Sequence, residues 1–175
     1  MDSIKKVAAI ATLWCLFASG SALAEDMSNA RIAELLERLE LDIEGADGVW
    51  RFIVQGVEVT IITDENADRM RIISPVVDAE SLDNDQYKRI MQANFDTALD
   101  ARYAIAKSYL WSAFIHPLSP LTDRQFIEGI GQVVNLVTTF GTTYHSGSAV
   151  FGGGDSQGIE ERELIEKLIE RGLAI

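Results

Sequence analysis

The side chains that could support catalysis or bind a metal ion are few and widely spaced. His116 and His145 are the two histidines of the chain. A histidine pair can ligate a metal ion, but no carboxylate accompanies these two at a fixed spacing. Ser146 and Ser148 beside His145 could suggest a nucleophile, but their segment is rich in glycine and lacks the strand–turn–helix context of a nucleophilic serine. We therefore expect neither a catalytic nor a metal site here.

A cluster of acidic residues and a run of glycines are the remaining candidates. Asp64, Glu65 and Asp68 could form a carboxylate pair or ligate calcium, but they lack the spacing and the glycine of an EF-hand loop. A solvated turn accounts for them. Residues 152–154 are three glycines without the lysine and the strand–helix context of a phosphate-binding loop. The sequence thus predicts no cofactor, no metal and no enzymatic activity.

The first 24 residues have the pattern of a bacterial secretory signal peptide. Lys5 and Lys6 precede an uncharged apolar run at 7–18, and the small residues Ala22 and Ala24 match a cleavage site after Ala24. An uncleaved membrane anchor is the alternative, but the run is shorter than the roughly 20 apolar residues that span a membrane. We expect a periplasmic or secreted protein that has no stable membrane span after cleavage.

The composition limits the class of partner. The formal net charge is −12, with 47% hydrophobic and 24% charged residues. This surface repels phosphate groups, so nucleic acid is not an expected partner, whereas a protein or peptide is. Cys15 is the single cysteine and lies in the predicted signal peptide. The remaining chain would therefore have no disulfide, thiolate metal site or cysteine nucleophile.

Hydrophobic periodicity predicts three helices and five strands. The first helix begins at a cap on Ser28 or Asn29, and the second spans 83–94. The third begins at a capping box formed by Thr122 and Gln125. The strands cover 49–55, 57–63, 69–74 (closed by Pro75) and the two arms of a hairpin that turns at Lys107-Ser108. Residues 25–144 therefore form an α+β domain with an antiparallel five-stranded sheet, in the order α-β-β-β-α-β-β-α.

The C-terminal part of the chain is expected to be a linker followed by a helix. Residues 145–158 are rich in glycine and serine, as in a flexible linker. Residues 159–175 form an acidic amphipathic pattern, with Leu164 and Leu168 on its apolar stripe. A free helix of this length is marginal in water. We expect it to dock on its own domain, on a sister subunit or on a partner.

The hairpin within 101–122 is the most apolar stretch after residue 25. Its second strand places Leu110 and Phe114 on one side and Trp111 on the other. Apolar residues on both sides are typical of a strand that is buried on both sides. Alternatively, helices cover one side of the sheet and a partner covers the other, because large exposed apolar patches usually mark interfaces.

Several segments, together with the order of the elements, resemble the type III secretion chaperones of the CesT (Tir chaperone) kind and the related YbjN-like proteins. They are VWRFIVQGVEVTIIT, RMRIISPV and the helix entry LSPLTDRQF, within 32–144. The resemblance implies a small α+β protein that commonly dimerises and holds an extended client segment on hydrophobic patches without ATP. Type III chaperones are cytoplasmic, so the predicted signal peptide favours an exported YbjN-like member.

Three functional hypotheses follow from these observations. The first is an exported, non-enzymatic protein that binds a protein or peptide partner, with a homodimer as its possible assembly. Its candidate contact residues are Leu110, Trp111, Phe114, Leu164 and Leu168. The second is a periplasmic small-ligand carrier or enzyme with a pocket between the sheet and the helices. The third is a structural module whose acidic tail helix docks onto a larger complex.

Overall fold

The computed structural model of the protein describes residues 26–46, 48–96, 98–141 and 155–173. The predicted signal peptide, His145, Ser146 and Ser148 lie outside the described residues. The elements, in chain order, are α1 (Asn29–Arg38), β1 (Glu44–Ala46), β2 (Val49–Val54), β3 (Val57–Asp64), β4 (Arg69–Asp78), the 3₁₀ turn η1 (Ala79–Ser81), α2 (Asn84–Asp96), β5 (Arg102–Ala106), β6 (Tyr109–His116), α3 (Asp123–Thr138) and α4 (Asp155–Gly172).

The helix starts follow the predicted caps. The Ser28 hydroxyl accepts from the backbone N–H of Arg31 and begins α1. Thr122 and Gln125 form the expected capping box at α3, because the Thr122 hydroxyl accepts from the Gln125 backbone while the Gln125 side chain accepts from the Thr122 backbone. These caps satisfy amide donors that would otherwise be unpaired at each helix start.

The sheet is antiparallel, as predicted, but it has six strands rather than five, in the order β1-β2-β3-β4-β6-β5. The additional strand β1 pairs with the start of β2 at one edge. Its three residues are all exposed, so the sequence has no alternation of apolar and polar side chains that would predict this strand. Gly45 within it has a φ of +94° and lies against the backbone of Val49, where a side chain has no room.

Strand β4 also differs from the prediction, because Pro75 does not close it. The strand continues to Asp78 and pairs with β6 along its length, with a register shift between Pro75 and Val77. Pairing with β3 ends at Ile73. The second half of β4 therefore has a neighbour on one side only, and an edge of this kind tolerates a proline.

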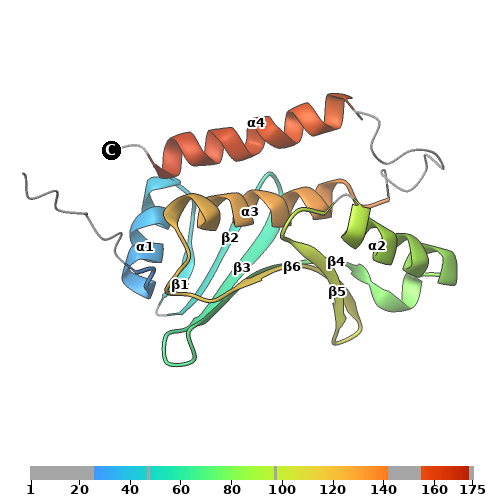
Figure 1. Cartoon of the computed structure of the whole chain (residues 1–175), viewed down its shortest axis with the longest axis horizontal. Coiled ribbons are helices and arrows are strands. Elements are labelled where there is room, and N and C mark those ends of the chain that lie inside the picture. Colours follow the sequence, from blue (N-terminus) through green and yellow to red (C-terminus); the bar gives the residue numbers. More distant parts are fainter. Residues whose placement is uncertain (1–25, 47, 97, 142–154, 174–175) are drawn as a thin grey trace, which may run out of the picture.

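The core lies between the sheet and α3 (Figure 1). Phe126, Ile130 and Val133 of α3 are fully buried and face Ile72 and Phe114 of the sheet. The packing is close: a Cβ on Gly129 would lie 3.1 Å from the ring of Phe114 and 3.2 Å from Ile72. The absence of a side chain at Gly129 therefore lets α3 lie close to the sheet.

Helix α2 covers only the β5 edge of the sheet. Ile90 and Ala93 are its buried residues. Met91 lies on the same apolar stripe of the helix as Ile90 but is exposed, because α2 has so few neighbours. The side-chain amide of Asn94 donates to the carbonyl of Tyr103 at 3.0 Å and accepts from the amide of Tyr103 at 2.7 Å. Asn94 thus occupies backbone groups of β5 at the free sheet edge.

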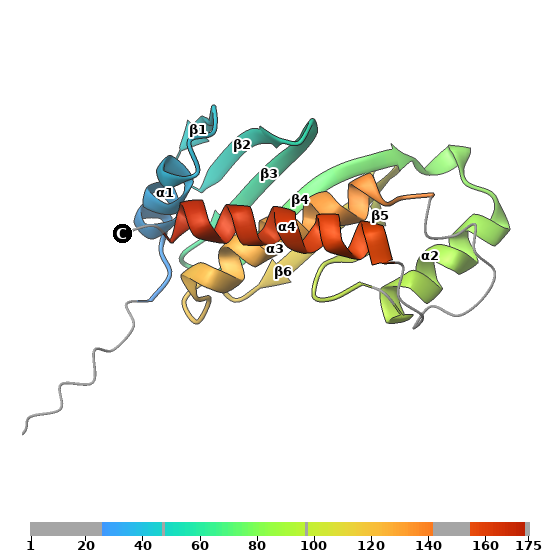
Figure 2. The ribbon, with the colours of Figure 1, turned by 90° about the horizontal axis from the view of Figure 1, so that it is seen from above.

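Helix α4 begins at Asp155, four positions before the helix that the sequence predicted, so the last part of the expected linker is helical. It packs on α3 and, near its C-terminal end, on α1 (Figure 2). Leu164 and Leu168 are buried in this contact. In this structure the tail docks on its own domain. Across the described residues, no helix is both long and apolar enough to cross a membrane.

Candidate protein-binding surface

One face of the sheet carries no described helix. Helices α3 and α4 stack on the opposite face, and α1 and α2 lie toward the two ends (Figures 1 and 2). The helices lie on one face because α3 fills the space above β3, β4 and β6 and α4 packs on α3 rather than on the sheet. We call the uncovered surface the open face.

Branched apolar side chains lie on the open face at alternate positions of the strands. Ile53 and Ile115 are 64% and 61% exposed, and Val49, Ile62 and Tyr109 are exposed as well. The register places Val49 beside Ile62, Ile62 beside Arg71, and Arg71 beside Ile115, so one row crosses four strands. Exposed apolar groups in such an array, rather than scattered singly, are typical of an interface.

Trp111 lies at the far end of the open face. It is half-buried, and its neighbours in register are Pro75 and Ala104. The indole Nε1 donates to the carbonyl of Ala106 at 2.9 Å, and the ring centre of Tyr109 lies 6.2 Å away. The small alanines of β5 leave room for the indole to lie across that strand, where it forms an apolar platform with a satisfied donor.

Arginines separate the apolar residues of the open face. Arg51, Arg71 and Arg102 are exposed and alternate with the inward-facing core residues of their strands. They stand in a chain with a formal net charge of −12. A surface of apolar groups and guanidinium groups fits a partner that carries both apolar side chains and carboxylates.

The structure separates the five contact residues that the sequence suggested. Trp111 is on the open face. Leu110 and Phe114 point the other way and lie beneath α3, 0% and 4% exposed, so they have no surface for a partner in this arrangement. Leu164 and Leu168 belong to α4 and are buried on its inner side. They lie on the other side of the sheet from Trp111. The strand alternation places Leu110 and Phe114 together and Trp111 opposite them.

Structural contacts account for the acidic cluster. Glu65 accepts from the amide of Asn29 at 2.8 Å, and Asp68 accepts from the amide and hydroxyl of Ser119 at 2.7 and 3.1 Å. The hydrogen bond from the Ser119 amide is the main reason that the pKa of Asp68 is lowered. Asp64 accepts from the amide of Ala67. These carboxylates fix loops, and the described residues contain no cluster suited to a metal ion.

His116 also has a structural role. Its ring is stacked 6.0 Å from Phe114, and Nδ1 lies 2.7 Å from the carbonyl of Pro117. The ring is half-buried at the end of β6. These contacts give His116 a structural role at the end of strand β6.

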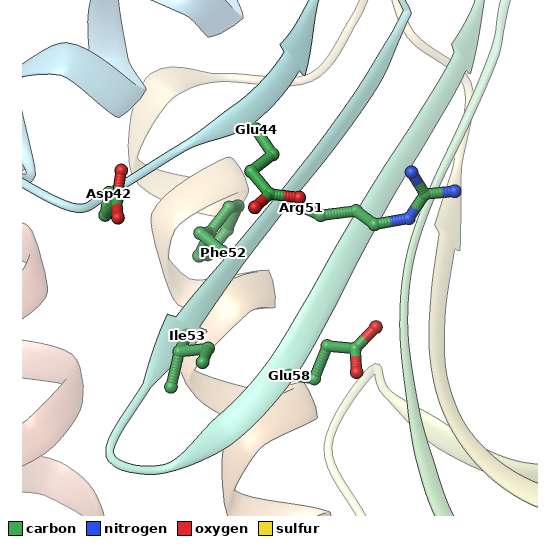
Figure 3. Close-up of a pocket in the computed structure, with 6 residues that line it drawn as sticks. All are labelled: Asp42, Glu44, Arg51, Phe52, Ile53 and Glu58. Carbon is green, nitrogen blue, oxygen red and sulfur yellow. The ribbon is translucent and has the colours of Figure 1, made fainter.

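A hollow of about 350 Å³ opens at the β1 end of the sheet. Figure 3 shows its lining residues, with the Arg51 side chain extended across β3 and Glu44 and Glu58 on the neighbouring strands. The carboxylates and the guanidinium could bind a polar group of a partner. Among the described residues that line it there is no histidine, serine or cysteine that could act as a nucleophile.

The space between the sheet and the helices, where the second hypothesis requires a pocket, is filled by side chains. Phe126 and Ile130 are fully buried there, and Gly129 lies in contact with Phe114 and Ile72. Two hollows of the described surface lie at the sheet edge and beside α4. A ligand pocket between sheet and helices therefore gains no support from the described residues.

The family of the chain follows from its sequence. Residues 31–137 match the model of the Tir chaperone protein (CesT) family, which is more than half of the 175 residues. The chain belongs to this family. Membership in the CesT family, which is non-enzymatic, confirms the resemblance to type III secretion chaperones. The matched region ends within α3, so α4 lies outside it. A search of curated protein sequences found no match.

Solved structures are similar to the CesT-family domain. A chain of the ExsC–ExsE complex has a TM-score of 0.51 and 16% identity, and the match covers 62% of this chain and 86% of that chain. This similarity establishes the shared α+β fold. A chain of the HopA1–SchA chaperone–effector complex matches with a TM-score of 0.48 and 13% identity, covering 65% and 94%. A chain of the Yersinia pestis type III secretion chaperone SycH with a fragment of YscM2 has a TM-score of 0.48 and 15% identity, covering 63% and 97%.

Sequence reasoning had not selected the most exposed apolar residues of the open face, Ile53 and Ile115. Both sit at alternate positions opposite core residues, so the signal was present in the strand pattern. The missing information was which side the helices cover. That depends on how α3 crosses the sheet, and strand alternation alone does not contain it.

Proposed function

We propose that the protein is an exported, non-enzymatic, YbjN-like member of the CesT family that binds an extended segment of a partner protein on its open face. The observation that carries the proposal is the set of exposed branched side chains on the open face, of which Ile53 and Ile115 are the most exposed. Family membership supports a chaperone-like role. The arginines between the apolar groups favour a segment in which apolar and acidic residues alternate.

The geometry favours binding on the face rather than at the sheet edges. At the β5 edge, Asn94 already pairs with the backbone of Tyr103. At the β1 edge the strand is three residues long. A segment that joined the sheet as a strand would need free backbone groups over several residues. A segment laid across the open face needs side-chain contacts with Ile53, Ile115 and Trp111 instead.

An array of extended peptides, scanned with the wild-type protein and with Ile53→Asp/Ile115→Asp, tests the proposal. Burying one isoleucine stabilises a complex by about 1.5–3 kcal/mol, so the double variant should bind the selected peptides at least tenfold more weakly. The matched control is Ser81→Asp/Gln92→Asp, which adds the same charge at exposed positions away from this face. Equal binding by wild type and the Ile53/Ile115 variant would exclude the open face.

Charge reversal at Arg71 tests the chemistry of the partner. Arg71→Glu should weaken acidic peptides tenfold or more and leave uncharged apolar peptides within about twofold, because it removes an ion pair without removing apolar area. The interaction should also weaken as salt is raised. A uniform loss across both peptide classes would contradict an acidic partner.

We propose further that two copies associate through α2. Met91 and Phe95 are four positions apart on one helix face, and Phe95 is 88% exposed; Leu99 follows in the next loop and is exposed too. A cluster of this kind is costly in a monomer. Light scattering after size exclusion should give a dimer for wild type and a monomer for Phe95→Glu, with Gln92→Glu on the same helix as the control. A monomeric wild type would remove this part of the proposal.

Export is supported by the first residues of the sequence and by the start of the fold. The predicted cleavage after Ala24 would leave Met27 close to the new N-terminus, where its side chain is buried and its amide donates to the carbonyl of Ser119 at 3.1 Å. Mass spectrometry of the protein from a periplasmic fraction should find a chain that begins at Glu25. Recovery of the uncleaved chain from the cytoplasm would refute export.

A further inference from the structure

Helix α3 is apolar on two sides. One side packs on the sheet through Gly129 and Ile130. The other side carries Ile127 and Gly131, which face away from the sheet and contact α4. A helix at the surface of a small domain ordinarily has a polar outer side. The CesT-family match begins within α1, includes most of α3 and ends before α4. In this chain the outer side of α3 and the end of α1 form an apolar surface that α4 covers, and we call it the groove between α1 and α3.

Helix α4 fits this groove through two reciprocal contacts. A Cβ on Gly131 would lie 2.5 Å from Cγ1 of Ile165, and a Cβ on Gly172 would meet the side chains of Ile127 and Leu39. Each helix therefore offers a glycine to an isoleucine of the other. Because Ile127 meets Gly172 and Gly131 meets Ile165, the two helices are antiparallel, as Figure 2 shows. The groove selects a helix with a branched side chain and, two turns later, a glycine.

The contact rests on side-chain packing. For the described side chains of 163–173, no hydrogen bond or ion pair to another element is found, and Lys167 pairs with Glu163 inside the helix. A hollow of about 530 Å³ runs beside the contact, lined in part by Glu128, Gln132 and Ile165. One flank of the groove is thus open to solvent. A helix held in this way can be replaced by a competing helix of the same shape.

We propose that the groove between α1 and α3 is a second docking site, which takes an amphipathic partner helix with the isoleucine–glycine pattern of α4, and that α4 occupies this site as a built-in competitor. The site lies on the other side of the sheet from the open face and does not depend on the function proposed for that face. A partner helix gains access when α4 leaves.

A disulfide that locks α4 in place tests the proposal in the full chain. The variant is Ile127→Cys/Gly172→Cys in a Cys15→Ser background. A Cβ at position 172 lies 3.2 Å from Cγ1 of Ile127, which is close enough for a bridge. The probe is a fluorescent peptide of residues 155–173, followed by anisotropy. The reduced protein should bind it, and the oxidised protein should bind at least tenfold more weakly. The same polypeptide serves in both states, so folding is matched.

Two further measurements fix the site. The peptide with Ile165→Asp should not bind the reduced protein, and full-length Leu168→Asp, which weakens docking in cis, should bind the normal peptide at least tenfold more tightly than wild type. Glu166→Gln, on the exposed side of α4, should behave as wild type. Equal binding by the oxidised and reduced proteins would place the peptide elsewhere and overturn the proposal. So would a failure of both the reduced protein and Leu168→Asp to bind it.

Discussion

Asp68 joins two distant parts of the chain. Its carboxylate accepts from the amide and hydroxyl of Ser119, fifty-one positions later, while Glu65 in the same turn accepts from the amide at the start of α1. The turn between β3 and β4 thereby positions both the start of α1 and the loop that leads into α3. The acidic residues that resembled a metal site therefore hold neighbouring loops in place through hydrogen bonds.

The pH dependence of stability should report this contact. The folded pKa of Asp68 lies below its ordinary value of 3.8, mainly because of the Ser119 amide. A lowered folded pKa contributes stability above the unfolded pKa and loses it as the pH falls through the folded pKa. Urea unfolding from pH 2.5 to 7 should show wild type more stable than Asp68→Asn at neutral pH, with the difference shrinking below about pH 4. Asp42→Asn, an exposed carboxylate, should show no such convergence.

Single residues were predictable where one local rule acts. The Thr122–Gln125 box needs no knowledge of the rest of the fold, and the structure has it as the sequence predicted. Trp111 was assigned to the side opposite Leu110 and Phe114 for the same reason. The partners of Asp68 and Glu65 were not predictable, because both contacts join residues that are far apart in the sequence.

The hairpin of β5 and β6 turns through two residues that carry side chains. Lys107 and Ser108 have φ values of +51° and +63°, as in the tight turn that ordinarily selects asparagine and glycine. Lys107→Asn/Ser108→Gly should therefore raise the free energy of unfolding by about 1 kcal/mol. Chemical denaturation measures the change, and Lys107→Gln serves as the control that removes the charge but keeps the strain. No gain in the double variant would show that the turn is unstrained.

Two glycines of α3 should respond differently to the same substitution. Gly129→Ala pushes a methyl group against Phe114 and Ile72 in the core and should destabilise the whole fold by about 1–3 kcal/mol. Gly131→Ala pushes against Ile165 and should loosen α4 while the sheet stays protected. Hydrogen exchange resolved by segment distinguishes the two cases. Equal loss of protection across all segments in both variants would contradict this separation.

Elements with a clear hydrophobic period were predictable, and those held by pairing alone were not. The helices and the longer strands follow their apolar spacing. Strand β1 has three exposed residues and exists because β2 offers it backbone partners. The continuation of β4 past Pro75 likewise depends on pairing with β6, a strand that comes more than thirty residues later in the sequence. The exposure of Met91 was not predictable either, because the helical period does not reveal how little of α2 is covered.

The molecule as a whole has two apolar surfaces that differ in what covers them. The helix side is covered by α4 through Leu164 and Leu168, whereas the open face carries exposed Ile53 and Ile115 between arginines. The sequence left two alternatives open: a strand buried on both sides, or a sheet with one side covered by helices and the other available to a partner. It could not identify the sides, because that depends on the path of α3 over the strands and of α4 over α3.

The contact between Asn94 and Tyr103 has a consequence for solubility. A sheet with an unpaired outer strand can recruit strands from other molecules and grow into aggregates. Here the β5 edge is occupied at Tyr103 by a side-chain amide, and the β1 edge is short and shaped by Gly45. Asn94→Leu should free the β5 edge, and concentrated solutions should then scatter light and bind an amyloid dye, whereas Gln92→Leu on the same helix should stay clear. The side chain of Asn94 thus occupies backbone groups that the edge strand of another copy would otherwise pair with.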